Sequence, residues 1–398
     1  MLKPGQTQQD SYAQWVRHAL GMARARQGHA VSLFESSVPE PRELLRQTVA
    51  AAMAPTLSPY YASAFGGGNP FVLEMLAASY GVAREQVLCT TGATGALALL
   101  YRTFAGAGDH ILVETPGFDV FETIGADLGY RFETFERTGP TYTIDPAAIA
   151  AKIRPDTKMI VLSDLHNPSG MLLDRSVLAE LALLAEQRGI LLLVDEVYGA
   201  YASASDRPVS AAALSPAVVS VSSLTKIFGL GALRCGWIVG SAPVVAAART
   251  LASRIEFGMS TLSHSIAAHV LASPAPFRAH SDHYVAQSRR IFDPWFHEMA
   301  AQGLVAGTLP KAGCICFPSL PGIPDTHAFS DWLVETAGVI VAPGEYFGAP
   351  GHVRIGYCLE AEQLEAGLAG LAQGIRAYRA MGAGGHGKDL SAAGGLAR

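Results

Sequence analysis

Charged residues are scarce in this sequence, and their scarcity limits the classes of protein to which it can belong. Only 16% of the 398 residues are Asp, Glu, Lys or Arg, whereas 49% are hydrophobic. Such a composition excludes a disordered chain, because so much apolar surface must be buried in a core or against a partner subunit. The formal net charge of -5 offers no basic surface for nucleic acid. We therefore expect a compact globular protein with no nucleic-acid partner.

Long apolar runs are also missing. The longest, such as GILLLV at 189–194, are far shorter than the roughly 20 residues that span a bilayer. Residues 1–28 are polar and lack the apolar core of a secretory signal. We therefore expect no membrane-spanning segment and place the protein in the cytoplasm.

Cysteine is rare as well. The sequence has five, an odd number, and only Cys314 and Cys316 stand close together. This scattered set indicates neither a disulfide framework nor a zinc site, and reduced thiols are the simplest interpretation. The histidine pairs, such as His264 with His269, have no neighbouring carboxylates or cysteines that would complete a metal shell. We expect no metal.

What the sequence does contain is an alternation of short apolar runs with longer stretches rich in Ala and Leu. Continuous apolar strands that alternate with helices predict an α/β sheet, mostly parallel and covered by helices on both faces. Such sheets bind their ligands at the carboxyl ends of the strands. The helical stretches include 94–104 and 175–188, and the seven expected strands are 86–91, 110–115, 131–136, 158–163, 189–196, 218–223 and 235–240.

The sequence changes character after about Ser273. A long helical stretch at 277–302 precedes two strands, at 313–320 and 352–359, and a closing helix at 361–381. This order predicts a second, smaller α+β domain.

The domain boundaries follow from these changes. We expect an N-terminal arm at 1–45 that joins the small domain, a large domain at 46–272 and the small domain at 273–381. Residues 382–398 are rich in Gly and Ala without a periodic apolar face, so we expect a flexible tail there.

One lysine directly follows an expected strand. Lys226 lies in the Gly-rich segment SVSSLTKIFGLGALRCGW, after Ser223 and Thr225 and before Arg234. A phosphate-bearing aldehyde cofactor needs such a set, because the amine forms an imine while the hydroxyls and the guanidinium hold the phosphate. Taken alone, the segment fits an ordinary surface lysine in a strand-to-helix loop equally well.

A carboxylate follows the most apolar strand. Asp195 comes directly after GILLLV, where an unpaired buried charge would be costly. A protonated pyridine nitrogen would be a suitable partner, because the ion pair lets the ring accept the electrons of a carbanion at the substrate α-carbon. Tyr198, in the same DEVY segment, could donate its hydroxyl to the ring's phenolate oxygen. By itself, Asp195 is more simply a capping or salt-bridged acid.

Two other strand ends carry matching groups. Asn167, in HNPSG, has an amide that could bind the same phenolate oxygen, although Asn-Pro is a turn signal in any protein. Gly92, Ala93 and Thr94 open the helix after the first expected strand. Free backbone N–H groups and the positive end of the helix dipole favour a phosphate there.

The sequence resembles the fold-type I, class I/II pyridoxal phosphate aminotransferases in a series of motifs that occur in the same order along the chain. These motifs are TGATGAL, TPGF, HNPSG, DEVY, SSLTKIFGLGALRCG, PGEYFG and VRIGYC. The resemblance extends from about residue 31 to residue 380. It implies transfer of an amino group between an amino acid and a 2-oxo acid through a Schiff base on Lys226. It also implies that Asp195 binds the pyridinium nitrogen, that Asn167 and Tyr198 bind the phenolate oxygen, that Phe118 stacks on the ring, and that Gly92, Ala93, Thr94, Ser223 and Arg234 hold the phosphate.

The resemblance also implies a substrate site and a quaternary structure. Arg354 would bind the substrate α-carboxylate, next to Asn167. The family is typically homodimeric, with a tyrosine that reaches the neighbouring subunit's phosphate, here Tyr61 or its neighbour Tyr60. The sequence departs from the pattern at Leu73, where an arginine is usual, and at LFESSVPEP, where a G-x-P segment normally borders the substrate. We therefore expect an unusual substrate pocket.

Other chemistries stay open at this point. Elimination, decarboxylation, racemisation or cyclisation can start from the same carbanion, so a lyase, decarboxylase or cyclase of this fold is an alternative. Ser223 and Lys226 also match the S-x-x-K of serine acyl-transfer enzymes, but that reading leaves Asn167 and Asp195 unexplained. A nucleotide-binding oxidoreductase would need G-x-G-x-x-G, and only Gly92-x-x-Gly95 is present. A non-catalytic regulator normally carries a DNA-binding domain, for which the short N-terminal region leaves little room.

Overall fold

One seven-stranded sheet forms the centre of the protein. The computed structural model describes residues 11–26, 29–54, 56, 58–207, 209–256 and 258–383. The sheet has the order β2-β8-β7-β6-β5-β3-β4, and only β8 is antiparallel to its neighbours. The mostly parallel sheet predicted from the sequence is thus confirmed, with strands β2 (Val87–Thr91), β3 (His110–Thr115), β4 (Arg131–Glu136), β5 (Thr157–Ser163), β6 (Leu191–Asp195), β7 (Val218–Ser223) and β8 (Cys235–Val239).

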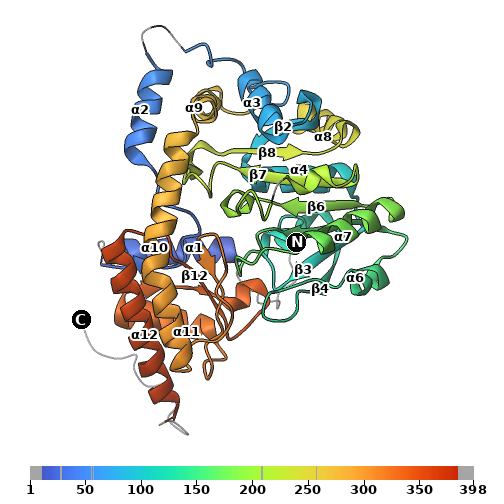
Figure 1. Cartoon of the computed structure of the whole chain (residues 1–398). Coiled ribbons are helices and arrows are strands. Elements are labelled where there is room, and N and C mark those ends of the chain that lie inside the picture. The colour runs from blue at the N-terminus through green and yellow to red at the C-terminus, as the bar shows by residue number, and fades with distance from the viewer. Residues whose placement is uncertain are drawn as a thin grey trace, which may run out of the picture.

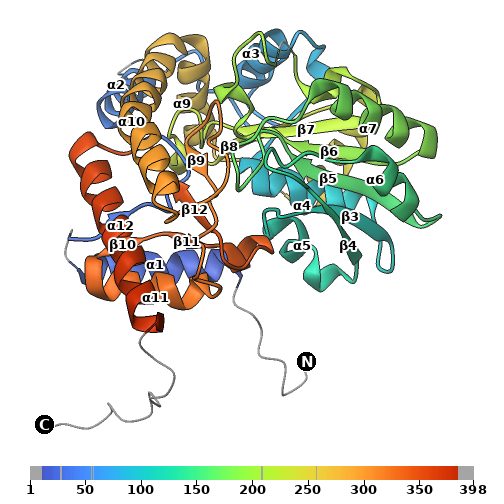
Figure 2. The ribbon, with the colours of Figure 1, turned by 60° about the horizontal axis from the view of Figure 1, so that its bottom comes forward.

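Helices cover both faces of this sheet (Figures 1 and 2). Because successive side chains of a strand point to opposite faces, Ile111 and Val113 pack beneath α4 and α8, whereas Leu112 packs on the side of α7. Both faces are therefore apolar, as continuous apolar strands require. The covering helices are α3 (Pro70–Tyr80), α4 (Gly92–Phe104), α6 (Pro146–Lys152), α7 (Arg175–Arg188), α8 (Ala242–Ile255) and α9 (Thr261–Ala272), and a short α5 (Val120–Thr123) follows β3.

The C-terminal part packs three helices against two small sheets. The helices are α10 (Ala275–Ala301), α11 (Thr326–Ala337) and α12 (Ala361–Ala383). One sheet pairs β1 (Val31–Ser32) with β10 (Val339–Ile340), and the other has the order β11-β12-β9, formed by Ala342–Pro343, Val353–Gly356 and Ile315–Cys316. The two strands expected here are much shorter than predicted. Pro318, which has no N–H to donate, interrupts the first of them.

The N-terminal region contains two helices that the sequence did not reveal, α1 (Tyr12–Ala25) and α2 (Arg42–Ala52). α1 packs Trp15 against Phe34 and Tyr346, and β1 joins the small sheet through β10. Between α1 and α2 the chain passes along the carboxyl edge of the central sheet. None of the described helices is both long and apolar enough to cross a membrane. Most of the predicted tail, residues 384–398, lies outside the described residues.

Candidate active site

The carboxyl ends of the parallel strands meet at a cavity of about 160 Å³. Asp195 ends β6, Asn167 follows β5, and Lys226 follows β7, so the sheet itself brings these three side chains together. The structure gathers here most of the residues that the sequence singled out. The cavity is lined by Ala93, Thr94, Phe118, Asn167, Asp195, Tyr198, Ser223, Thr225, Lys226, Arg234 and Arg354.

One end of the cavity is built to hold an anion. Gly92 has φ +73°, and a Cβ at this position would lie 2.5 Å from NH2 of Arg234, so the guanidinium packs against the first turn of α4. A Cβ on Gly236 would lie 2.3 Å from the backbone of Gly92, which leaves room for nothing larger than glycine there. The guanidinium, the helix N-terminus and the neighbouring Ser223 and Thr225 form a cradle that suits a phosphate group.

The opposite side carries two polar groups that lack strong partners. Asp195 is 5% exposed and accepts the N–H of Val197 at 3.0 Å. Burial raises the pKa of this carboxyl to about 7, and the Val197 bond only partly opposes it. The hydroxyl of Tyr198 is buried and makes no hydrogen bond of normal geometry within the described residues, although Ser36 interacts with it. A cationic ring with a phenolate oxygen would satisfy both groups, so the residues present fit pyridoxal phosphate.

Lys226 faces the same space. Its Nζ donates to the hydroxyl of Ser36 at 2.9 Å and lies 5.8 Å from the ring centre of Tyr198. Burial lowers the pKa of this amine to about 8, and the charge of Arg354 acts in the same direction. Lys226 therefore loses its proton more readily near physiological pH than an exposed lysine does.

Arg354 closes the cavity from β12 and is only 1% exposed. Its NH1 donates to Oδ1 of Asn167 at 2.9 Å, and its NH2 donates to the hydroxyl of Tyr12 and to the carbonyl of Phe34 at 3.3 Å. The rings of Tyr12 and Phe347 lie 5.0 and 4.9 Å from the guanidinium carbon. The guanidinium is thus oriented by neutral groups, which leaves its charge available for an anion.

Two polar side chains of the cavity, Tyr12 and Ser36, were not found from the sequence, nor were the apolar Leu97 and Val197. Ser36 belongs to LFESSVPEP, whose departure from the G-x-P pattern was a signal that this border differs, although it did not indicate which residue matters. Tyr12 belongs to a segment whose polarity gave no sign of a role at the site. Its position depends on Asp119, whose Oδ2 accepts the backbone N–H of Tyr12 at 2.7 Å.

The tyrosines expected to serve a neighbouring subunit do not line this cavity. The ring of Tyr60 packs against Phe71 and His269, at centroid distances of 5.3 and 4.8 Å. Tyr61, in contrast, is 42% exposed. The structure therefore leaves Tyr61 outside the site of its own chain.

The serine acyl-transfer arrangement is not formed. Ser223 accepts the N–H of Thr225 at 3.3 Å, while the amine of Lys226 is bonded to Ser36. A serine nucleophile would need that amine as its base. Among the described residues, no three His, Cys, Asp or Glu side chains are grouped to hold a metal ion.

Comparison with known proteins agrees with this geometry. The family model "Aminotransferase class I and II" matches residues 40–371. The arginine–pyruvate transaminase AruH of Pseudomonas aeruginosa is 27% identical over 371 residues, which cover 89% of this chain and 92% of that protein. A double mutant of Thermus thermophilus aspartate aminotransferase has the same fold, with a TM-score of 0.82 at 24% identity over 93% of this chain and 98% of that one. A pyridoxal phosphate-dependent aminotransferase from Streptococcus suis gives 0.79 at 26% identity over 90% and 97%. The chain therefore belongs to the class I and II aminotransferases, enzymes that use pyridoxal 5'-phosphate to move an amino group between an amino acid and a 2-oxo acid.

Proposed function

We propose that the cavity at the strand ends is the site where this transfer takes place, with Lys226 as the residue that bonds the cofactor. The observation that carries this proposal is the meeting of an amine, a buried acid and a buried phenol on one small cavity. When bound, pyridoxal phosphate supplies an electron sink for the substrate α-carbon. Asp195 would hold its ring nitrogen, Asn167 and Tyr198 its phenolate oxygen, Phe118 its ring face, and Gly92, Ala93, Thr94, Ser223, Thr225 and Arg234 its phosphate.

Lys226 then has a second role as the base. When Nζ is not bonded to the cofactor, it would be free to take the proton from the substrate α-carbon and later to return it. The lowered pKa of Lys226 suits both transfers, because an amine near its pKa accepts and donates protons with similar ease. Asn167 connects this chemistry to Arg354, since its Oδ1 accepts from the guanidinium and its Nδ2 remains available to donate.

We propose a substrate with a single carboxylate. Three cations line the cavity among the described residues, and each has a role, Lys226 as base, Arg234 at the phosphate and Arg354 at the α-carboxylate. A second carboxylate on the substrate side chain would find no cation of its own and would be desolvated at a cost.

A panel of amino acids with pyruvate as acceptor tests the function and this substrate class together. Arginine belongs in the panel because the Pseudomonas relative is named for arginine and pyruvate. We expect formation of alanine and the matching 2-oxo acid with neutral or basic amino acids, and much slower turnover with aspartate and glutamate. Ammonia release without alanine would instead identify a lyase, and faster turnover with a dicarboxylate would refute the single-carboxylate proposal.

Replacing Arg354 by lysine should raise the substrate KM by roughly 30-fold, which corresponds to about 2 kcal/mol. The ammonium of lysine keeps the charge but cannot bind both carboxylate oxygens with a planar fork. Cofactor content, measured from the visible absorbance, should stay close to wild type. Arg376→Lys, on the exposed surface of α12, is the matched control and should change neither quantity. Equal losses of substrate binding and cofactor content in Arg354→Lys would contradict the assigned role.

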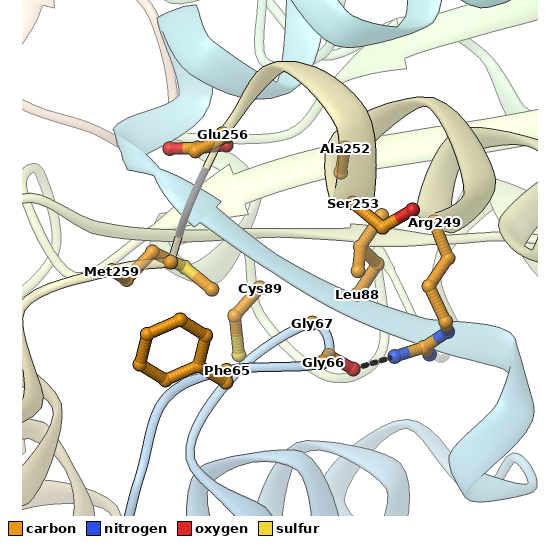
Figure 3. Close-up of a pocket in the computed structure, with 11 residues that line it drawn as sticks. Phe65, Gly66, Gly67, Leu88, Cys89, Arg249, Ala252, Ser253, Glu256 and Met259 are labelled. Carbon is orange, nitrogen blue, oxygen red and sulfur yellow. Dashed lines mark hydrogen bonds between the residues drawn. The ribbon is translucent and has the colours of Figure 1, made fainter.

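We further propose that the protein is a homodimer that joins through the face formed by the loop after α2, the end of α8 and the start of α9. Large apolar side chains are exposed on these segments. Figure 3 shows a pocket of about 170 Å³ on this face, where Arg249 donates to the carbonyl of Gly66 at 2.6 Å. The exposed side chains are Met53 (52%), Tyr61 (42%), Phe65 (63%), Ile255 (52%) and Leu262 (45%).

In such a dimer Tyr61, already exposed, is the tyrosine that reaches the phosphate held by the other subunit. We expect Tyr61→Phe to weaken cofactor affinity by about tenfold, because a hydroxyl bond to a charged phosphate contributes roughly 1.5 kcal/mol. Titration of the cofactor-free protein measures this, with Tyr60→Phe as the control that should bind normally. Sedimentation would show whether wild type is dimeric, and a monomer with full cofactor affinity would overturn the proposal.

A cytoplasmic location is proposed on the state of the thiols. All five cysteines are free and buried, which suits a reducing compartment. We likewise propose a division into an N-terminal arm, a large domain at 46–272 and a small domain at 273–381. The proposal is supported by the strands, which form one central sheet and two separate small sheets.

A further inference from the structure

Ser36 lies on the segment between β1 and α2 and contacts the amine of Lys226 directly. The hydroxyl oxygen accepts a hydrogen bond from Nζ at 2.9 Å, although the two residues are 190 positions apart in the chain. The serine side chain is only 9% exposed. The bond is therefore set by the tertiary fold and not by the local sequence.

Two glycines hold the backbone around Ser36 in place. A Cβ on Gly356, in β12, would lie 1.5 Å from the carbonyl oxygen of Glu35. A Cβ on Gly229, in the loop that carries the lysine, would lie 2.7 Å from the carbonyl oxygen of Pro39. The segment is thus packed backbone to backbone on both sides, and its serine cannot withdraw from the cavity without moving a strand or the lysine loop.

The hydrogen bond between Ser36 and Lys226 affects the chemistry of the free amine in two ways. A lysine amine on a flexible four-carbon stem can rotate away from the atom that it must deprotonate. A hydroxyl oxygen that accepts one N–H limits this rotation. It also stabilises the ammonium form more than the neutral amine, because a hydrogen bond from a charged donor is stronger.

We propose that Ser36 is a further catalytic residue, whose hydroxyl orients Nζ of Lys226 for the α-proton and stabilises the amine while it carries that proton. In this step the C–H bond of the substrate would break, its proton would move to the lone pair of Nζ, and its electron pair would pass to the electron sink that bound pyridoxal phosphate supplies. Ser36 would keep its own proton throughout. The proposal rests on the proposed role of Lys226 as the base.

Several charged or titratable groups face the same amine from other elements. After burial, Arg354 of β12 lowers the pKa of Lys226, whereas Cys314, Glu35 and Asp195 raise it. Tyr198, whose ring centre lies 5.8 Å from Nζ, also interacts with Ser36 through its hydroxyl. Replacing Ser36 leaves all of these groups in place and removes only their contacts with its hydroxyl. The effect of removing the hydroxyl alone is therefore a further decrease in the pKa of Lys226.

The test compares Ser36→Ala with Ser36→Thr, which keeps the hydroxyl, and with Ser37→Ala as the matched control on the neighbouring serine. In the full-length protein without cofactor, brief labelling with acetic anhydride across the pH range, followed by mass spectrometry of the Lys226 peptide, gives the titration midpoint of this amine. We expect the midpoint to fall by roughly 1 pH unit in Ser36→Ala and to be retained in the other two. In the holoenzyme, Ser36→Ala should lower kcat about tenfold and change KM little.

An unchanged labelling midpoint in Ser36→Ala would overturn the proposal, and so would an equal loss of kcat in Ser36→Thr, which would indicate a role in packing only. Failure of the wild-type enzyme to transfer amino groups would refute the proposed function instead. The two failures are distinguishable, because the labelling experiment requires neither cofactor nor turnover.

Discussion

Replacement of Lys226 by alanine is expected to abolish turnover and to remove the visible absorbance of the bound cofactor. Lys226 carries the one amine among the described residues that line the cavity, so the variant would lack both the proposed covalent attachment and the proposed base. The loss of a general base alone costs about 10²- to 10⁴-fold in rate. Absorbance spectra of the purified variant and a coupled assay for the 2-oxo acid measure the two losses separately.

Lys311→Ala is a suitable control, because Lys311 is exposed and does not line the cavity. It should match wild type in both measurements. Added methylamine can replace the missing base but not the covalent attachment, so we expect it to restore a small part of the turnover of Lys226→Ala. A visible spectrum identical to wild type in Lys226→Ala would refute the assignment of the attachment site.

Asp195→Asn should produce the second largest loss, about 10³-fold in kcat. This is the same order of magnitude as the loss expected when a catalytic proton acceptor is removed. Asparagine keeps an oxygen that can accept the N–H of Val197 but carries no charge to hold a ring cation. The Schiff base on Lys226 should still form, so the cofactor should remain bound with an altered absorbance maximum. The neighbouring acid Glu196 is not a usable control position, because Glu196→Gln would break the ion pair of Glu196 with Arg207.

The same substitution should stabilise the protein when the cofactor is absent. The carboxyl of Asp195 has a pKa of about 7 in the fold, above its ordinary 3.8. Between these values the folded state holds a proton that the unfolded state has lost, so stability decreases as pH rises and the loss is complete above about 7. The difference corresponds to at most roughly 4 kcal/mol. Asparagine does not ionise and avoids this loss.

Thermal denaturation of the cofactor-free proteins measures this effect. We expect Asp195→Asn to melt a few degrees higher than wild type at about pH 8 and at nearly the same temperature at about pH 4. Bound cofactor should cancel the advantage, because wild type then has a cation opposite the carboxylate. A variant less stable than wild type at the higher pH would show that Asp195 is already paired within the chain.

The central sheet and the residues at its edge could be predicted because their signals are local. Each strand is a short apolar run, and Asp195, Asn167 and Lys226 follow their strands directly. A parallel sheet places all such residues at one edge, whatever the details of packing. The resemblance added Phe118 and Arg354, and the structure places both on the same cavity.

The residues that were not predicted depend on contacts between distant parts of the chain. Ser36 meets Lys226 across 190 positions, and Tyr12 meets Arg354 across 342. No local periodicity or spacing carries such information. The helices α1 and α2 were missed although their sequences are amphipathic, so here a local signal was present and was not used. The proposed role of Tyr61 depends on a second chain, about which the sequence of one chain carries no local signal.

The pairing of Tyr12 with Arg354 also sets the order in which the site can mature. A ribosome makes α1 first, but the aromatic and cationic groups on which it rests, Tyr346, Phe347 and Arg354, emerge only near the end of synthesis. Until then the helix has only the earlier part of its docking surface, formed by Phe34, Phe118 and Asp119. The central sheet can form earlier and bring Lys226 and Asp195 together, while the side of the cavity that Arg354 closes stays open. The pocket is complete only after the C-terminal part of the chain has been made.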